Sequence, residues 1–181
     1  MSGTEVSAEQ VGMLVLIGAP GAGKSTVGRR LANRLSLPFV DVDQLIEQTS
    51  GREIADIFAT DGEATFRELE RAATVAALAG SEEQVVSLGG GAPMTEAIAE
   101  ALAPHHVVWL KVSPGAAADR VGLNVARPLL LGNVRSRLVS LLNARTPTYQ
   151  RLADHVVETD DHGADDIVEL IIEHRRELER R

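Results

Sequence analysis

The stretch GAPGAGKST, from Gly18 to Thr26, constrains the fold of this chain more than any other feature. It follows an apolar run, VGMLVLI, and precedes a helical pattern, VGRRLANRL. Its spacing matches G-x-x-x-x-G-K-[ST], a motif that requires a strand before it and a helix after it. A glycine-rich turn used only for tight packing would explain Gly18 but not a lysine and a hydroxyl at this spacing. The sequence therefore predicts a phosphate-binding loop, or P-loop, at residues 18–25.

The P-loop has the chemistry of a nucleoside triphosphate site. Its glycines allow backbone N–H groups to turn inward around a phosphate, and the N-terminus of the following helix adds partial positive charge. Lys24 can then reach the outer phosphates, while the hydroxyl of Ser25 can bind Mg²⁺. We expect a nucleoside triphosphate to be bound by Gly21, Ala22, Gly23, Lys24, Ser25 and Thr26.

Composition narrows the class of protein further. The chain has 181 residues, 44% of them hydrophobic, and no break in composition, so we expect a single domain at 11–181 after a flexible tail at 1–10. The absence of cysteine excludes disulfides and thiolate metal sites, which fits the cytoplasm. A net charge of -8 argues against nucleic-acid binding by phosphate neutralisation. The first apolar run is too short to span a bilayer, so we expect no membrane partner.

Short β-rich runs alternate with helical patterns along the chain. The β-rich runs cover 13–18, 38–43, 84–90, 106–112 and 155–160. The helical patterns cover 24–36, 63–79, 95–103, 133–144 and 164–179. Apolar strands that alternate with helices are typical of a parallel sheet buried on both faces. We therefore predict an α/β fold, a P-loop three-layer sandwich with a central five-stranded parallel sheet, whose ligands bind at the carboxyl ends of the strands.

The last helical pattern contains four residues at the spacing of one helical face. These residues are Ile167, Leu170, Ile171 and His174. We interpret them as the packed stripe of an amphipathic helix whose charged residues face solvent.

Two carboxylates end the second β-rich run, in the letters DVD. Alternation along a strand predicts that Asp41 and Asp43 point to the same side, near the P-loop. Asp41 could hold Mg²⁺ through a water, and Asp43 could accept a hydrogen bond from the hydroxyl that receives the phosphoryl group. Asp43 could instead be the N-cap of a helix beginning at QLIEQ.

Glycines and arginines supply further candidates for the binding of the phosphoryl acceptor. The third run ends in Gly89–Gly91, where a backbone can approach a ligand closely, although a helix start would use the same glycines. Arg67, Arg127 and Arg145 are candidates too, but a lone arginine is usually a solvated surface residue. The segment 122–132, with glycines at both ends, resembles a mobile lid that would exclude water.

Several segments, taken in order, resemble the shikimate kinase family. They are GAPGAGKST, the run from DVDQLIEQTS to FRELE, VSLGGGAP, ARPLL and ARTPTYQRLA. The resemblance extends from about residue 12 to about residue 172, which is nearly the whole chain. It implies a nucleoside monophosphate kinase-like fold. It also implies transfer of the γ-phosphoryl group of ATP to the 3-hydroxyl of shikimate, in aromatic amino-acid biosynthesis.

The resemblance also implies roles for individual residues. The residues that would bind shikimate are Asp43, Arg67, Gly89, Gly90, Gly91 and Arg145. Lys24 and Arg127 would contact phosphates and act in catalysis together with Asp43. Ser25 and Asp41 would hold Mg²⁺, and Arg120 would lie near the adenine of ATP.

Two other functions remain open from the sequence. A gluconate kinase would share the P-loop, although we would not expect it to carry the DVD, FR and GGG segments together. A nucleotide-switched regulatory protein would share the P-loop without an acceptor site, and its hydrolysis of ATP would not depend on shikimate. In either case no seam for oligomerisation is visible, so we expect a monomer.

Overall fold

The computed structural model describes residues 12–122 and 131–180. Its elements in chain order are β1 (Leu14–Ile17), α1 (Lys24–Leu35), β2 (Phe39–Asp41), α2 (Val42–Ser50), α3 (Ile54–Leu78), β3 (Val85–Ser87), the 3₁₀-helix η1 (Ala92–Met94), α4 (Glu96–Ala101), β4 (His106–Lys111), α5 (Pro114–Gly122), α6 (Leu131–Leu152), β5 (His155–Glu158) and α7 (Ala164–Glu179). The predicted tail at 1–10, most of the predicted lid at 122–132, and Arg127 lie outside the described residues.

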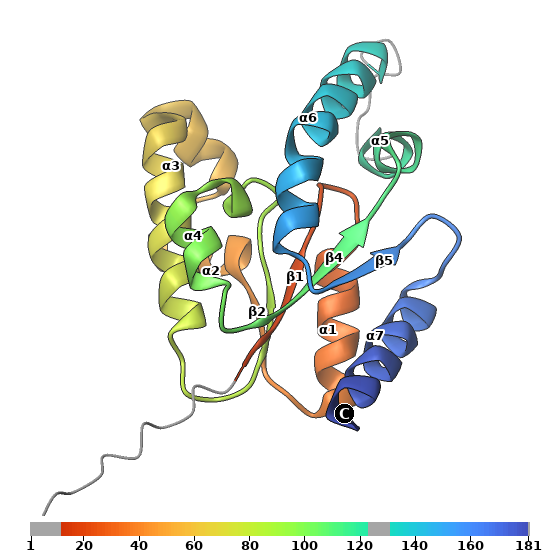
Figure 1. Ribbon diagram of the computed structural model, residues 1–181. Coiled ribbons are helices and arrows are strands. Elements are labelled where there is room, and N and C mark those ends of the chain that lie inside the picture. The colour runs from red at the N-terminus through yellow and green to blue at the C-terminus, as the bar shows by residue number, and fades with distance from the viewer. Residues whose placement is uncertain (1–11, 123–130, 181) are drawn as a thin grey trace, which may run out of the picture.

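The five strands form one parallel sheet, as predicted, and their order in it is β2-β3-β1-β4-β5 (Figure 1). The central strand β1 pairs with β3 and β4, so that Leu14 lies beside Val85 on one side and His106 on the other. Since all pairs are parallel, the carboxyl ends of the strands lie at the same edge of the sheet. The P-loop and the segments after β2 and β3 therefore begin at one edge.

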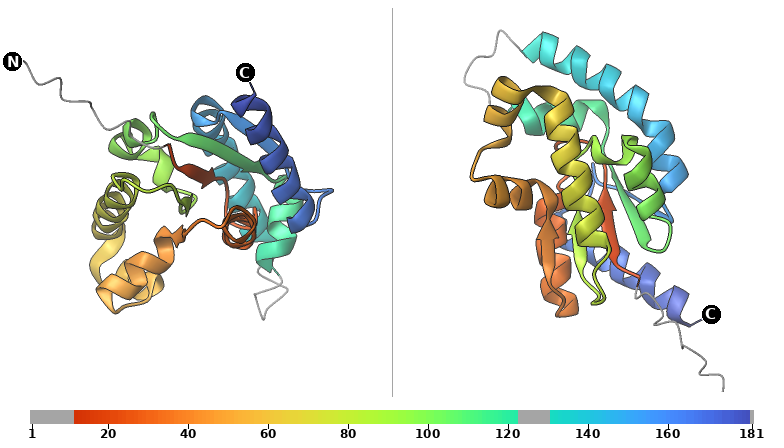
Figure 2. Two further views of the ribbon diagram at one scale, coloured as in Figure 1. Left: turned by 90° about the horizontal axis from the view of Figure 1, so that it is seen from below. Right: turned by 90° about the vertical axis from the view of Figure 1, so that its left-hand side faces the viewer.

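Helices cover both faces of the sheet, which makes the three layers (Figure 2). Side chains alternate along β1: Leu14 and Leu16 pack with α1 and α7, while Val15 and Ile17 pack with α2, α3 and α4. All four are buried. Burying a side chain of this size contributes roughly 1.5–3 kcal/mol, so both faces contribute to stability. Among the described residues, no helix combines the length and apolar character needed to cross a bilayer.

The structure has more helix than the sequence patterns indicated. The predicted helix 63–79 is the second part of α3, which has a kink at Gly62 (φ 84°, ψ 171°). The helix predicted at 133–144 continues through Pro147 to Leu152. Helix α5 was not predicted at all. The prediction of the packed residues of α7 was partly wrong. Leu170, which it included, is 39% exposed, whereas Ile172, which it did not include, is buried.

The end of β2 also differs from the prediction. The strand ends at Asp41, and Asp43 lies in the first turn of α2 rather than in the strand. Alternation along β2 therefore does not decide where Asp43 points. Asp41, and not Asp43, is the N-cap of α2.

Candidate active site

The P-loop lies between β1 and α1, in the context that its motif requires. Gly23 caps α1 with φ 89°, a backbone conformation that glycine adopts without steric cost. Helix α1 begins at Lys24, whose Nζ donates to the carbonyls of Gly18 (2.7 Å) and Ala19 (2.9 Å). The ammonium group therefore lies over the P-loop itself.

The charge of Lys24 depends on its surroundings. Burial lowers the pKa of Lys24 to about 8, an effect that the carboxylates of Asp43 and Asp41 oppose and the guanidinium of Arg145 adds to. These three side chains come from α2, the end of β2 and α6. The lysine, two carboxylates and an arginine thus interact electrostatically at one edge of the sheet.

Ser25 and Asp41 form the next part of the site. The Ser25 hydroxyl donates to Oδ2 of Asp41 at 2.5 Å. The other carboxylate oxygen, Oδ1, accepts from the backbone N–H groups of Asp43 (3.1 Å) and Gln44 (3.3 Å), which fixes the orientation of the carboxylate. A hydroxyl and a carboxylate oxygen are the oxygen ligands that Mg²⁺ prefers, so this pair fits the predicted cation.

Asp43 is a half-buried carboxylate among other acidic groups. Burial, together with the negative charges of Asp41 and Glu70, raises the pKa of Asp43 to about 6, and the opposing effect of Lys24 is smaller. A carboxylate with such a pKa is a stronger base than an ordinary aspartate. It can accept a proton near neutral pH.

The glycine loop, Gly89–Gly91 after β3, lies against the candidate acceptor residues. A Cβ built on Gly89 would lie 2.8 Å from Oδ1 of Asp43 and 2.9 Å from Oε1 of Glu70. Contacts under about 3 Å at a Cβ force the structure to shift. Glycine at position 89 therefore allows both carboxylates to approach the backbone.

The next two glycines face the two candidate arginines. A Cβ on Gly90 would lie 3.1 Å from Nη1 of Arg145, and one on Gly91 would lie 2.5 Å from Nη1 of Arg67. The structure thus brings Arg67, Arg145 and Asp43 to one glycine loop, although they lie on α3, α6 and α2. Sequence spacing alone did not establish this grouping.

Two residues of this site were not predicted from the sequence. Glu70 is only 1% exposed and accepts from Nη1 of Arg67 at 2.8 Å. Tyr149 is also 1% exposed, and its hydroxyl donates to the carbonyl of Gly90 at 2.5 Å. A signal was present, because Glu70 follows Arg67 by three residues and Tyr149 follows Arg145 by four, spacings that share a helical face.

Arg120, on α5, connects the P-loop to the end of β5. Its Nη1 donates to the carbonyl of Gly21 at 3.0 Å, and its Nη2 donates to the carbonyl of Thr159 at 3.2 Å. Thr159 is fully buried. Arg120 therefore restrains the P-loop from outside, and its contact with adenine remains a prediction.

Comparison with known proteins decides the family. A family model described as shikimate kinase matches residues 20–176. The chain belongs to the shikimate kinase family. The resemblance seen in the sequence is thus confirmed, together with the class of ATP-dependent phosphotransferase. Membership of the shikimate kinase family also decides against a gluconate kinase and against a regulatory switch.

Individual shikimate kinases agree in length as well as in sequence. The shikimate kinase of Thermobifida fusca is 52% identical over 88% of this chain and 92% of its own. That of Mycobacterium avium is 47% identical over 87% of this chain and 90% of its own. A shikimate kinase from Acinetobacter baumannii, solved in complex with shikimate, is 32% identical, covers 94% of this chain and 97% of its own, and superposes with a TM-score of 0.84. The fold is that of the nucleoside monophosphate kinase-like shikimate kinases, as predicted.

Proposed function

We propose that this protein transfers the γ-phosphoryl group of ATP to the 3-hydroxyl of shikimate, forming shikimate 3-phosphate and ADP. The observation that carries this proposal is the grouping of Asp43, Arg67 and Arg145 at the glycine loop, where Asp43 and Arg145 also interact electrostatically with Lys24. The relative from Acinetobacter baumannii, which was solved with shikimate, supports the choice of acceptor.

The acceptor chemistry fits these side chains. Shikimate has one carboxylate and three hydroxyls, so its site needs guanidinium donors for the carboxylate and an acceptor for a hydroxyl. Arg67 and Arg145 supply the donors, and the glycine loop lets both lie close to the backbone. The ion pair with Glu70 restrains the guanidinium of Arg67 before the substrate binds. Less conformational entropy is therefore lost on binding.

Asp43 acts on the hydroxyl that attacks. Its carboxylate accepts the hydrogen bond of the 3-hydroxyl and takes the proton as the new oxygen–phosphorus bond forms. The bond between the γ-phosphorus and the bridging oxygen of ADP breaks in the same displacement. Lys24 and Arg127 balance the negative charge on the transferring group, and positioning supplies much of the remaining rate enhancement.

Ser25 and Asp41 would hold Mg²⁺, and the cation supplies charge neutralisation on the β- and γ-phosphates when it is bound. Asp41 is suited to this role because its Oδ1 is fixed by the start of α2 while Oδ2 faces the Ser25 hydroxyl. The backbone of Gly21–Gly23 and the residues Ser25 and Thr26 would surround the phosphates of ATP.

Further features of the enzyme belong to the proposal. We infer a monomer of one domain at 11–181, with a lid at 122–132 that carries Arg127 and an adenine contact from Arg120. The absence of cysteine from the sequence supports a cytoplasmic location.

A coupled assay of ADP release against a panel of polyhydroxy acids tests the proposal. Turnover of ATP should require shikimate and should not occur with gluconate or without an acceptor. The variant Lys24→Ala should fold and lose turnover by roughly 10² to 10⁴, because a positioned charge facing the transferring group is removed. ATP hydrolysis that is indifferent to shikimate would refute the proposed function.

A further inference from the structure

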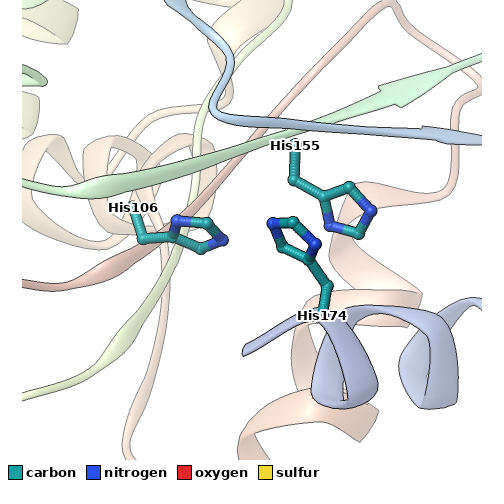
Figure 3. Close-up of side chains that lie close together, drawn as sticks. All are labelled: His106, His155 and His174. Carbon is teal, nitrogen blue, oxygen red and sulfur yellow. The ribbon is translucent and has the colours of Figure 1, made fainter. Parts of the chain in front are cut away.

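Three histidines gather at the end of the sheet away from the active site. His106 is the first residue of β4, His155 is the first residue of β5, and His174 lies near the end of α7 (Figure 3). The amino ends of parallel strands lie opposite the edge that holds the P-loop. The group is therefore separate from the residues proposed for catalysis.

Strand register explains why the three rings meet. His155 lies beside Val108 in the sheet, and Val108 is two residues after His106. Alternation then places His106 and His155 on one face, the face on which Val108 packs against α7. His174 follows the buried Ile171 by three residues, so it lies on the packed side of that helix.

The ring nitrogens are close together and partly unpaired. Each histidine offers one nitrogen within 4.8 Å of the nitrogens of the other two. Nε2 of His106 and Nδ1 of His155 are buried, and neither has a hydrogen-bond partner among the residues described. Buried polar atoms are normally paired, so two unpaired nitrogens in one cluster indicate a missing partner.

The surrounding charges suit the binding of a cation. Nδ1 of His106 lies 4.0 Å from Oδ2 of Asp154, so a negative charge lies beside the cluster. Burial lowers the pKa of His106, and that of His155 to about 4, so both rings are neutral near pH 7. The nearby Arg175 is paired with Glu83 (2.5 Å) and Glu179 (3.0 Å), which offsets its charge.

We propose that His106, His155 and His174 bind a divalent transition-metal ion such as Zn²⁺. Imidazole nitrogens are ligands that suit zinc, copper and nickel, whereas Mg²⁺ binds oxygen ligands. Tetrahedral coordination with Zn–N bonds of about 2.0–2.1 Å places ligand nitrogens about 3.3 Å apart. Rotation of the rings would bring the nitrogens from their present separations to that distance, and a water would complete the coordination.

An ion at this site would act on stability and not on catalysis. It would connect β4 and β5 to α7. The ring of His155, on β5, already stacks on the ring of His174, on α7, at a centroid distance of 3.8 Å. His106 also lines a surface pocket of about 320 Å³ with Leu178 and Arg175, so this ring can be reached from the surface. Ligand binding to the folded state alone raises the melting temperature.

The test is a Zn²⁺ titration of the full-length chain without an affinity tag. Saturating Mg²⁺ occupies the oxygen site at Ser25 and Asp41, and a chromophoric chelator that competes for Zn²⁺ reports the affinity. We expect one ion per chain and a rise in melting temperature of about 3 °C or more at a hundredfold excess over the dissociation constant.

Variants assign the site to the cluster. His174→Gln and His155→Gln should each weaken Zn²⁺ binding by at least about tenfold. Each removes a ligand, and even the loss of a residue that only orients a ligand costs about tenfold or more in affinity. The matched control, His162→Gln, changes an exposed histidine in the segment before α7 and should leave the affinity within about twofold. Shikimate-dependent turnover should be unchanged in all three.

A measurement on the wild-type chain keeps the proposal testable if a variant fails to fold. Ring ¹⁵N resonances of His106, His155 and His174 should shift on addition of one equivalent of Zn²⁺, while those of His105 and His162 should not. If the cluster only packs α7 onto the sheet, no such selective shift will occur and Zn²⁺ will bind wild type and variants equally. That result would overturn the proposal.

Discussion

Gly89 and Asp43 approach each other so closely that a Cβ on the glycine would lie 2.8 Å from Oδ1 of the aspartate. The same Cβ would lie 2.9 Å from Oε1 of Glu70, a side chain that is 1% exposed and cannot move aside into solvent. The position of the Asp43 carboxylate therefore depends on a residue without a side chain at position 89.

Gly89→Ala should therefore displace Asp43 and reduce activity. We expect kcat/KM for shikimate to fall by at least about tenfold, since small misplacements of reacting groups are costly. Gly163→Ala is the matched control, because the nearest atom to its Cβ is the flexible carboxylate of Asp166 at 3.3 Å. Steady-state kinetics of the two variants check this, and equal activity in both would contradict it.

The sequence predicted the parts of the site that depend on local pattern. The P-loop is predicted from its own spacing, and the five strands are predicted from short apolar runs that alternate with helical patterns. The predicted β-rich runs all contain a strand of the observed sheet. The order of the strands, by contrast, comes from tertiary packing and was not predicted.

The remaining differences have physical causes. The letters DVD fit a strand, but the side chain of Asp41 bonds the N–H groups of Asp43 and Gln44 and starts a helix there. The helical pattern was predicted to end at residue 144, yet α6 continues through Pro147 to Leu152, and Tyr149 in this last part bonds the carbonyl of Gly90 and packs against Trp109. The spacing of Glu70 from Arg67 shows that they share a helical face, but the position of Glu70 beside Gly89 depends on how α3 packs against the glycine loop.

The two arginines at the glycine loop should act on one substrate. Arg67→Ala and Arg145→Ala should each raise the KM for shikimate strongly, by an amount equivalent to roughly 2–5 kcal/mol if the ion pair is desolvated. The KM for ATP should change little. Arg71→Ala is the control, since Arg71 lies on the same helix and pairs with Glu68 on its exposed side. Equal effects on both substrates in initial-rate kinetics would refute the assignment.

The pH dependence of kcat/KM should have two limbs. This parameter reports the free enzyme, in which the pKa of Asp43 is about 6 and that of Lys24 about 8. Activity should fall as pH decreases through about 6, because Asp43 becomes protonated, and as pH increases through about 8, because Lys24 loses its charge. Rates measured from about pH 5 to about pH 9.5 check this. A flat acid side would contradict the role given to Asp43.

Asp43 should also reduce stability at neutral pH. The pKa of Asp43 in the folded state, about 6, lies above its ordinary value of 3.8. The protonated form therefore contributes stability that is fully present below about pH 4 and is lost as the pH rises through about 6. Asparagine cannot ionise, so Asp43→Asn should be more stable at pH 7 by on the order of 2 kcal/mol. Urea unfolding at pH 7 and pH 5 measures this, and the gain should shrink at the lower pH. A loss of stability at pH 7 would contradict the effect of burial.

Shikimate-dependent turnover by Asp43→Asn tests the central claim most directly. The substitution keeps size and shape but removes the charge and the basicity, so kcat should fall by about 10² to 10⁴. ATP affinity, measured by direct titration, should stay within a few-fold of wild type. Because Asp41 is the cap of α2, no loss of a helix cap complicates the result. A variant that keeps turnover within about threefold of wild type, a difference of about 0.7 kcal/mol, would contradict the account.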